Sequence, residues 1–181
     1  LDKMGDVKGA SEKYIEALEI AELNQDKLAV ASCYTGLASL FMSQNMYDEA
    51  YIYLRKFEFS CSEFSEKVKP RCKAVAYTNI ANYFVSIEKP DSTIVYALKA
   101  IELKEKFKDY TGLSISYNAL AKAQVLIGDT TNALKSYEKS LAAAEVVNFK
   151  SEMLSTLLFL GNFYIKTNEL EKVDIIYNKT L

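Results

Sequence analysis

The chain has 181 residues but no histidine and no tryptophan, and it contains only 6 glycines and 2 prolines. Without histidine it cannot build a Ser-His-Asp triad, a Cys-His pair or an HExxH zinc site. Neither the G-x-G-x-x-G nor the G-x4-G-K-[ST] phosphate-binding pattern occurs. We therefore expect no enzyme active site, no metal site and no cofactor.

Charge of one sign is also missing. The 22 basic and 24 acidic residues nearly cancel, for a net charge of -2. Nucleic-acid affinity depends on clustered Lys and Arg, and only fragments such as "KEKFK" (104–108) occur. The most apolar segment, "LSTLLFLG" (154–161), is too short to span a bilayer. We expect neither direct nucleic-acid contact nor a membrane span in this segment.

The three cysteines are Cys33, Cys61 and Cys72, an odd number without CxxC spacing. This spacing favours small core residues. A Cys61–Cys72 disulfide stays open, because a separation of 11 residues does not establish one. The chain starts at Leu1 without a charged stretch followed by an apolar one, so no signal peptide is seen. The compartment is unknown; the cytoplasm is favoured, and the periplasm stays open if an upstream signal was removed.

Half of the residues are hydrophobic and turn formers are few, which favours an all-α fold with a sizeable core. Four segments repeat one pattern, and their starts lie 43, 40 and 40 residues apart. Each begins with an aromatic residue or leucine: Tyr34, Tyr77, Tyr117 and Leu157. Three residues later come an aliphatic and then a small residue, which is the 3–4 spacing of one helix face: Leu37-Ala38, Ile80-Ala81, Leu120-Ala121 and Leu160-Gly161.

A turn rich in Gly, Asn, Asp or Pro follows each first helix and leads to a second helix. The expected turns are "MGD" (4–6), "SQNMYD", "EKPD", "IGDT" and "KTNE". The second helix starts with a small or slim residue: Ala10, Ala50, Thr93, Ala133 and Val173. We predict one array in which 1–26 is the second half of a repeat, followed by repeats at 27–69, 70–109, 110–149 and 150–181.

These motifs resemble the tetratricopeptide repeat, with its aromatic-x2-Leu-Gly-x2-Tyr and Ala-x3-Phe pattern, over essentially the whole chain. Trp never takes the first aromatic position, the terminal Pro is missing, and the period is about 40 rather than 34 residues. The longer period looks like arrays of bacterial regulators and of kinesin light chains. The resemblance implies a right-handed superhelix of antiparallel helix hairpins, about nine helices, without cofactor.

The chain begins and stops inside a unit, so we expect a fragment of a longer protein or a homodimer through the uncapped C-terminal end. There Leu170, Val173, Ile176 and Tyr177 would leave apolar surface open.

The resemblance also implies a non-catalytic scaffold whose first helices line a concave groove for a protein or peptide. The alternative is a sensor module of a bacterial transcription regulator or signalling kinase. Thr35, Thr78 and Asn118 stand where a carboxylate clamp has lysine, which argues against a clamp. Amide side chains can pair with a peptide backbone in both directions. The family pattern therefore predicts these groove residues: Ser39, Thr78, Asn79, Asn82, Asn118, Lys122, Asn162 and Lys166.

Overall fold

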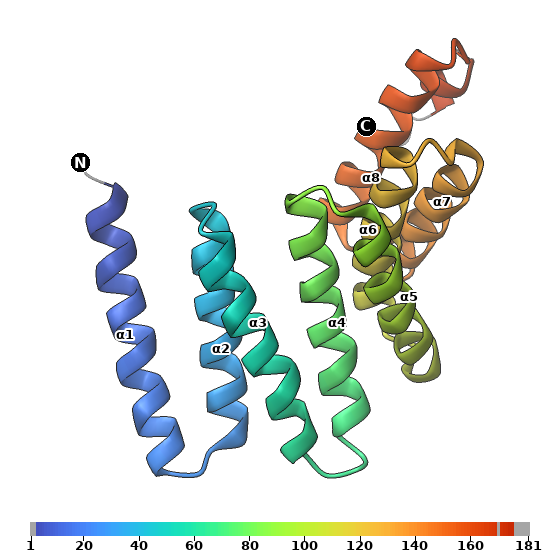
Figure 1. Cartoon of the computed structure of the whole chain (residues 1–181). Helices are drawn as coiled ribbons and strands as arrows, with labels where there is room; N and C mark the ends of the chain where they lie inside the picture. The colour runs from blue at the N-terminus through green and yellow to red at the C-terminus, as the bar shows by residue number, and fades with distance from the viewer. Residues whose placement is uncertain (1–2, 170, 176–181) are drawn as a thin grey trace.

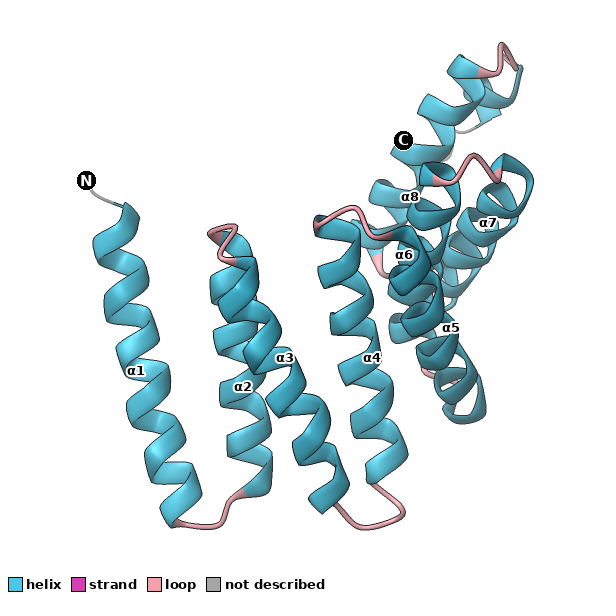
Figure 2. Cartoon of the chain, in the orientation of Figure 1, coloured by secondary structure: helices cyan, strands magenta, loops and turns pink. Residues whose placement is uncertain are grey.

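The computed structural model describes residues 3–169 and 171–175, with the backbone alone for residues 3–6. No strand occurs among them, and residues 171–175 are helical. The chain is an all-α solenoid, as predicted (Figure 1, Figure 2). Its elements are α1 (Lys3–Leu23), α2 (Lys27–Ser43), α3 (Tyr47–Ser60), the 3-10 turn η1 (Cys61–Glu63), α4 (Lys69–Ser86), α5 (Pro90–Phe107), α6 (Tyr110–Leu126), α7 (Thr130–Val146) and α8 (Lys150–Lys166).

The helices form an elongated stack in which each helix runs antiparallel to the one before it (Figure 1). Helices α4, α6 and α8 also contact one another in sequence, so they form a row of first helices. The turn predicted at residues 4–6 was wrong, because α1 runs through this stretch. None of the described helices is both long and apolar enough to cross a membrane.

The turns between helices recur at a fixed interval. Asp26, Asp109 and Asp129 accept hydrogen bonds from backbone N–H groups in the first turns of α2, α6 and α7. Residues with left-handed backbone end the preceding helices, as is common at helix C-termini. Successive ones lie 20 residues apart in every case but one, between Asn45 and Glu88: Gln25, Asn45, Glu88, Lys108, Gly128, Asn148 and Asn168.

The repeated aliphatic and small positions form the core, as the repeat predicts. Ile80 packs with Ala38, Leu54 and Tyr83, and Ala81 belongs to a second cluster with residues of α5 and α6. These positions are all buried: Leu37, Ala38, Ile80, Ala81, Leu120, Ala121 and Leu160. The small residues allow the two helices of a hairpin to approach closely.

A tyrosine–lysine contact repeats along the array and was not predicted. In three units the lysine 22 residues after the first-helix tyrosine places its ammonium over the tyrosine ring. The distances to the ring centroids are 5.9 Å for Lys56–Tyr34, 5.6 Å for Lys99–Tyr77 and 5.3 Å for Lys139–Tyr117. These tyrosines therefore join the first and second helices of their own units.

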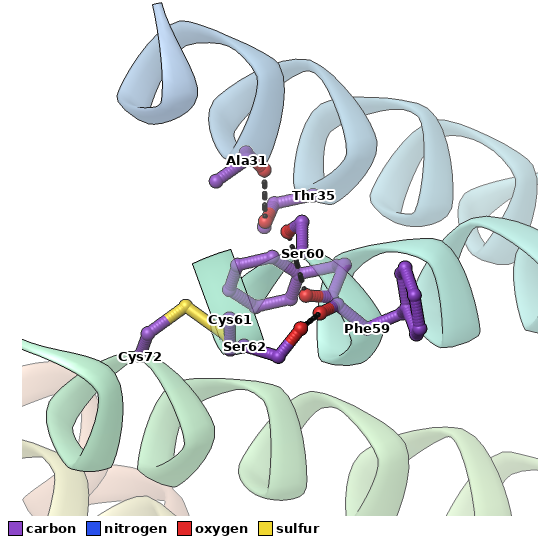
Figure 3. The surroundings of a disulfide bond; sticks show 8 residues. Ala31, Thr35, Phe59, Ser60, Cys61, Ser62 and Cys72 are labelled. Atoms are coloured by element: carbon purple, nitrogen blue, oxygen red, sulfur yellow. Dashed lines mark hydrogen bonds between the residues drawn. A yellow bond between two sulfur atoms is a disulfide. The ribbon is translucent and has the colours of Figure 1, made fainter. Parts of the chain in front are cut away.

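The cysteines behave differently from one another. Cys33 is free and buried, as expected of a core residue. Cys61 and Cys72 form a disulfide that joins η1 to α4 (Figure 3), so the core interpretation was wrong for this pair.

At the C-terminal end, Val173 is half-buried and packs against the cluster around Tyr137, Leu160 and Tyr164. It therefore adds little open apolar surface. The other residues predicted to be open there, Leu170, Ile176 and Tyr177, lie outside the described residues.

Candidate functional site

A groove of about 620 Å³ lies between the row of first helices and α7. Three of the predicted residues line it together: Lys122 from α6, and Asn162 and Lys166 from α8. Its remaining lining comes from four elements and is mostly apolar: Val85, Glu88, Val125, Leu126, Tyr137, Phe159 and Phe163. The groove therefore combines an apolar floor with a few polar groups, as ligand sites commonly do.

Aromatic stacking builds the floor. The ring of Phe159 is stacked on that of Tyr137, with centroids 5.5 Å apart and planes 12° from parallel. The ammonium of Lys122 lies 5.0 Å from the Phe159 ring centroid on another side of this stack. Such pairs hold aromatic rings in one orientation, so the floor is preformed. Burial raises the pKa of Tyr137 to about 12, which keeps its hydroxyl protonated.

The groove carries positive charge without a partner. Burial lowers the pKa of Lys122, and the Glu152 carboxylate opposes this shift. Within the described part of the chain, neither Lys122 nor Lys166 has a carboxylate oxygen within 4.0 Å of its ammonium. A half-buried ammonium without a counter-ion gains free energy when a ligand supplies an acceptor oxygen.

The other five predicted residues lie elsewhere. Ser39 is exposed on α2, and Asn79 and Asn82 are half-buried on α4; none of the three lines this groove. Thr78 and Asn118 are buried. The Thr78 hydroxyl lies 3.0 Å from that of Ser116 on α6, so it joins two helices.

Asn118 takes part in a buried polar network between α6, α7 and α8. Its Nδ2 donates hydrogen bonds to Glu152 Oε1 at 2.8 Å and to Thr156 Oγ1 at 3.3 Å. Ser140 of α7 lies 3.2 Å from the same Thr156 hydroxyl and donates to the Ser114 carbonyl at 2.8 Å. A satisfied network of this kind fixes how neighbouring helices are placed, and here it sets the position of α8 beside the groove.

Sequence reasoning missed a second groove, of about 810 Å³, at the opposite end of the array. It lies among α1, α2, α3 and η1, and its lining includes Tyr34, Lys56 and Phe59. Phe59 is 75% exposed, which is unusual for a large aromatic residue. The signal available in the sequence was the phenylalanine itself, since it falls on the polar side of α3.

The comparisons with known proteins agree with this architecture. The family model of the tetratricopeptide repeat matches residues 115–146, which span most of α6 and α7. A comparison with curated protein sequences found no match. The crystal structure of BtubC (BKLC) from P. vanneervenii superposes with a TM-score of 0.82 at 15% identity, over 96% of this chain and 72% of that one. Together with the repeated hairpins and their buried small residues, these matches identify the chain as a protein of the tetratricopeptide-repeat type.

Proposed function

We propose that the chain is a non-catalytic scaffold that binds a protein or peptide segment in the groove of α6, α7 and α8. Tetratricopeptide repeats generally mediate protein–protein interaction, and this repeat family is generally non-catalytic. The observation that carries the proposal is the convergence of Lys122, Asn162 and Lys166 on a stacked aromatic floor.

The groove suits an extended segment in chemical terms. The exposed Asn162 amide offers a donor and an acceptor to a peptide backbone. The two ammonium groups attract backbone carbonyls or an acidic side chain, and Phe159 and Phe163 offer apolar area. Such an arrangement gives modest affinity that depends on a few anchor residues.

The test is to pan a phage-displayed library of random peptides on the purified chain and to measure the selected peptides by fluorescence anisotropy. We expect Asn162→Ala to weaken binding about fivefold, the equivalent of about 1 kcal/mol for one hydrogen bond. A double variant, Lys122→Ala with Lys166→Ala, should lose more. Lys135→Ala is the matched control, because Lys135 is exposed on α7 and does not line the groove.

Circular dichroism of each variant shows whether the fold is kept. Peptides that bind all the groove variants as tightly as the unmodified chain would place the site elsewhere. Asn82→Ala tests the extent of the site: a loss equal to that of Asn162→Ala would extend it along α4.

A further inference from the structure

The Cys61–Cys72 disulfide occupies a position that recurs in every unit. It lies where the end of a second helix meets the start of the next first helix. The residues at this position in the four joints are Ala21 and Ala29, Cys61 and Cys72, Lys104 and Gly112, and Ala144 and Glu152. Only the joint between α3 and α4 is covalent.

That joint also departs from the others in its connection. Its two partners are 11 residues apart, whereas the partners in the other three joints are 8 apart. None of residues 61–69, all of them described, has the left-handed backbone that ends the other helices. Helix α3 packs less extensively against α4 than α5 packs against α6. The disulfide thus stands where the regular turn and the helix packing are weakest.

Two further contacts hold the connection beside the bond. The Lys27 ammonium donates a hydrogen bond of 2.8 Å to the carbonyl of Glu63 in η1. Phe64 packs against the cluster of Ala31, Phe57, Cys61 and Ala76. Because Lys27 is exposed, its hydrogen bond adds little, and the covalent bond is the main restraint on this segment.

We propose that the Cys61–Cys72 disulfide is a redox clamp that fixes α1–α3 on α4–α8, and that its reduction by a dithiol frees the N-terminal helices as a unit. Cys61 is 0% exposed and Cys72 is half-buried, so the attack falls on the sulfur of Cys72. A dithiol thiolate bonds to that sulfur, and Cys61 leaves as a thiolate and takes a proton. The second thiol of the dithiol then displaces Cys72, which also ends as a thiol, and the reductant closes to a cyclic disulfide.

Release would act on the second groove. Phe59, Ser60 and Glu63 line this groove and directly flank Cys61, as Figure 3 shows for the first two. Freed from α4, they no longer hold one position relative to α1 and α2. The clamp would then control whether the groove exists in its present shape.

Hydrogen exchange measured by mass spectrometry tests this proposal on the whole chain. All samples carry Cys33→Ala, which removes the free thiol and prevents disulfide exchange. The oxidised chain is compared with the same chain in dithiothreitol and with Cys61→Ala/Cys72→Ala, which installs the pair found naturally at Ala21 and Ala29. We expect amides of α3, η1 and the first turn of α4 to exchange at least tenfold faster after reduction, while those of α6 and α7 stay unchanged.

Three outcomes would overturn the proposal. The first is free Cys61 and Cys72 thiols in the chain purified without reductant. The second is equal exchange in oxidised and reduced samples. The third is faster exchange in all helices after reduction, which would make the bond a staple of the whole fold. The double variant gives the same reading without a reductant, so an incomplete reduction cannot mimic the second outcome.

Discussion

Two joints of the array solve one packing problem in different ways. Between α3 and α4 the position is closed by the Cys61–Cys72 disulfide. Between α5 and α6 it is closed by Lys104, whose side chain enters the space that Gly112 leaves beside it. Lys104 is only 3% exposed, and its ammonium lies 3.9 Å from Asp109 Oδ2.

The comparison shows that the position demands filled volume rather than one chemistry. A disulfide fills it without charge, whereas a buried lysine brings a charge that has left water. Burial lowers the pKa of Lys104 to about 8, although the Asp109 carboxylate opposes this shift. One joint therefore responds to reductants and the other to pH.

Breaking the covalent joint should have the largest effect. We expect Cys61→Ala/Cys72→Ala, in a Cys33→Ala background, to lower the free energy of unfolding by about 3 kcal/mol, because the loop is no longer closed in the unfolded chain. Urea unfolding followed by circular dichroism measures this loss. Cys33→Ala alone is the control and should retain nearly full stability. A double variant as stable as this control would show that the bond adds nothing.

The charged joint is tested by Lys104→Met, which keeps the length and removes the charge. Between about pH 8 and the ordinary lysine value of 10.5, the unfolded chain holds a proton that the folded chain has lost. The free energy of unfolding of the unmodified chain should therefore rise with pH across this window, by roughly 2 to 3 kcal/mol.

The Met variant should lack this rise and be the more stable chain at pH 7. Urea unfolding at pH 7, 8, 9 and 10 gives both curves. Lys135→Met serves as the control, since Lys135 is exposed. Parallel curves for the unmodified chain and Lys104→Met would mean that Lys104 is not the group concerned.

Gly112→Ala tests whether the two residues share one space. A methyl group there would collide with Lys104 and Asp109 side-chain atoms, and Lys104 has no exposed route to move into. We expect a loss of about 1 to 2 kcal/mol in the unmodified chain and a smaller one in a Lys104→Ala background. Thermal unfolding of the four chains in this cycle measures the coupling, and equal losses in both backgrounds would refute it.

The smallest effect is expected from Asp109→Asn. An asparagine still caps α6 through the Gly112 N–H, so only the charge is lost. Because Asp109 is partly exposed, the ion pair contributes only about 0.5 kcal/mol. The pKa of Lys104 should fall further without the carboxylate, as NMR titration of its ε-carbon resonance can show. A raised pKa would contradict this account.

The fold could be predicted from the sequence because repetition multiplies a weak signal. Leu37, Ile80 and Leu120 each fit a helix core poorly defined by themselves, yet their common phase identified the buried face. The turn at residues 4–6 failed for the same reason, since the expectation came from the repeat and the local sequence of α1 continues the helix.

The groove could be predicted only in part. Lys122, Asn162 and Lys166 come together, but Thr78 and Asn118 occupy the corresponding register and are buried. Whether such a residue faces solvent or the next first helix depends on the rotation between units, which a sequence period does not determine. The disulfide was similarly hidden: its separation of 11 residues is uninformative until the units are aligned on the joint.

The spacing of the left-handed turns has a practical consequence for engineering. Six of these turns leave no slack, because each closes a helix after the same 20-residue interval as its neighbour in sequence. An inserted residue there would rotate everything that follows. The exposed stretch Ser65–Lys67 lies outside this count and beyond the disulfide's first cysteine. It is the place where a fluorescent label or a short epitope would disturb the superhelix least.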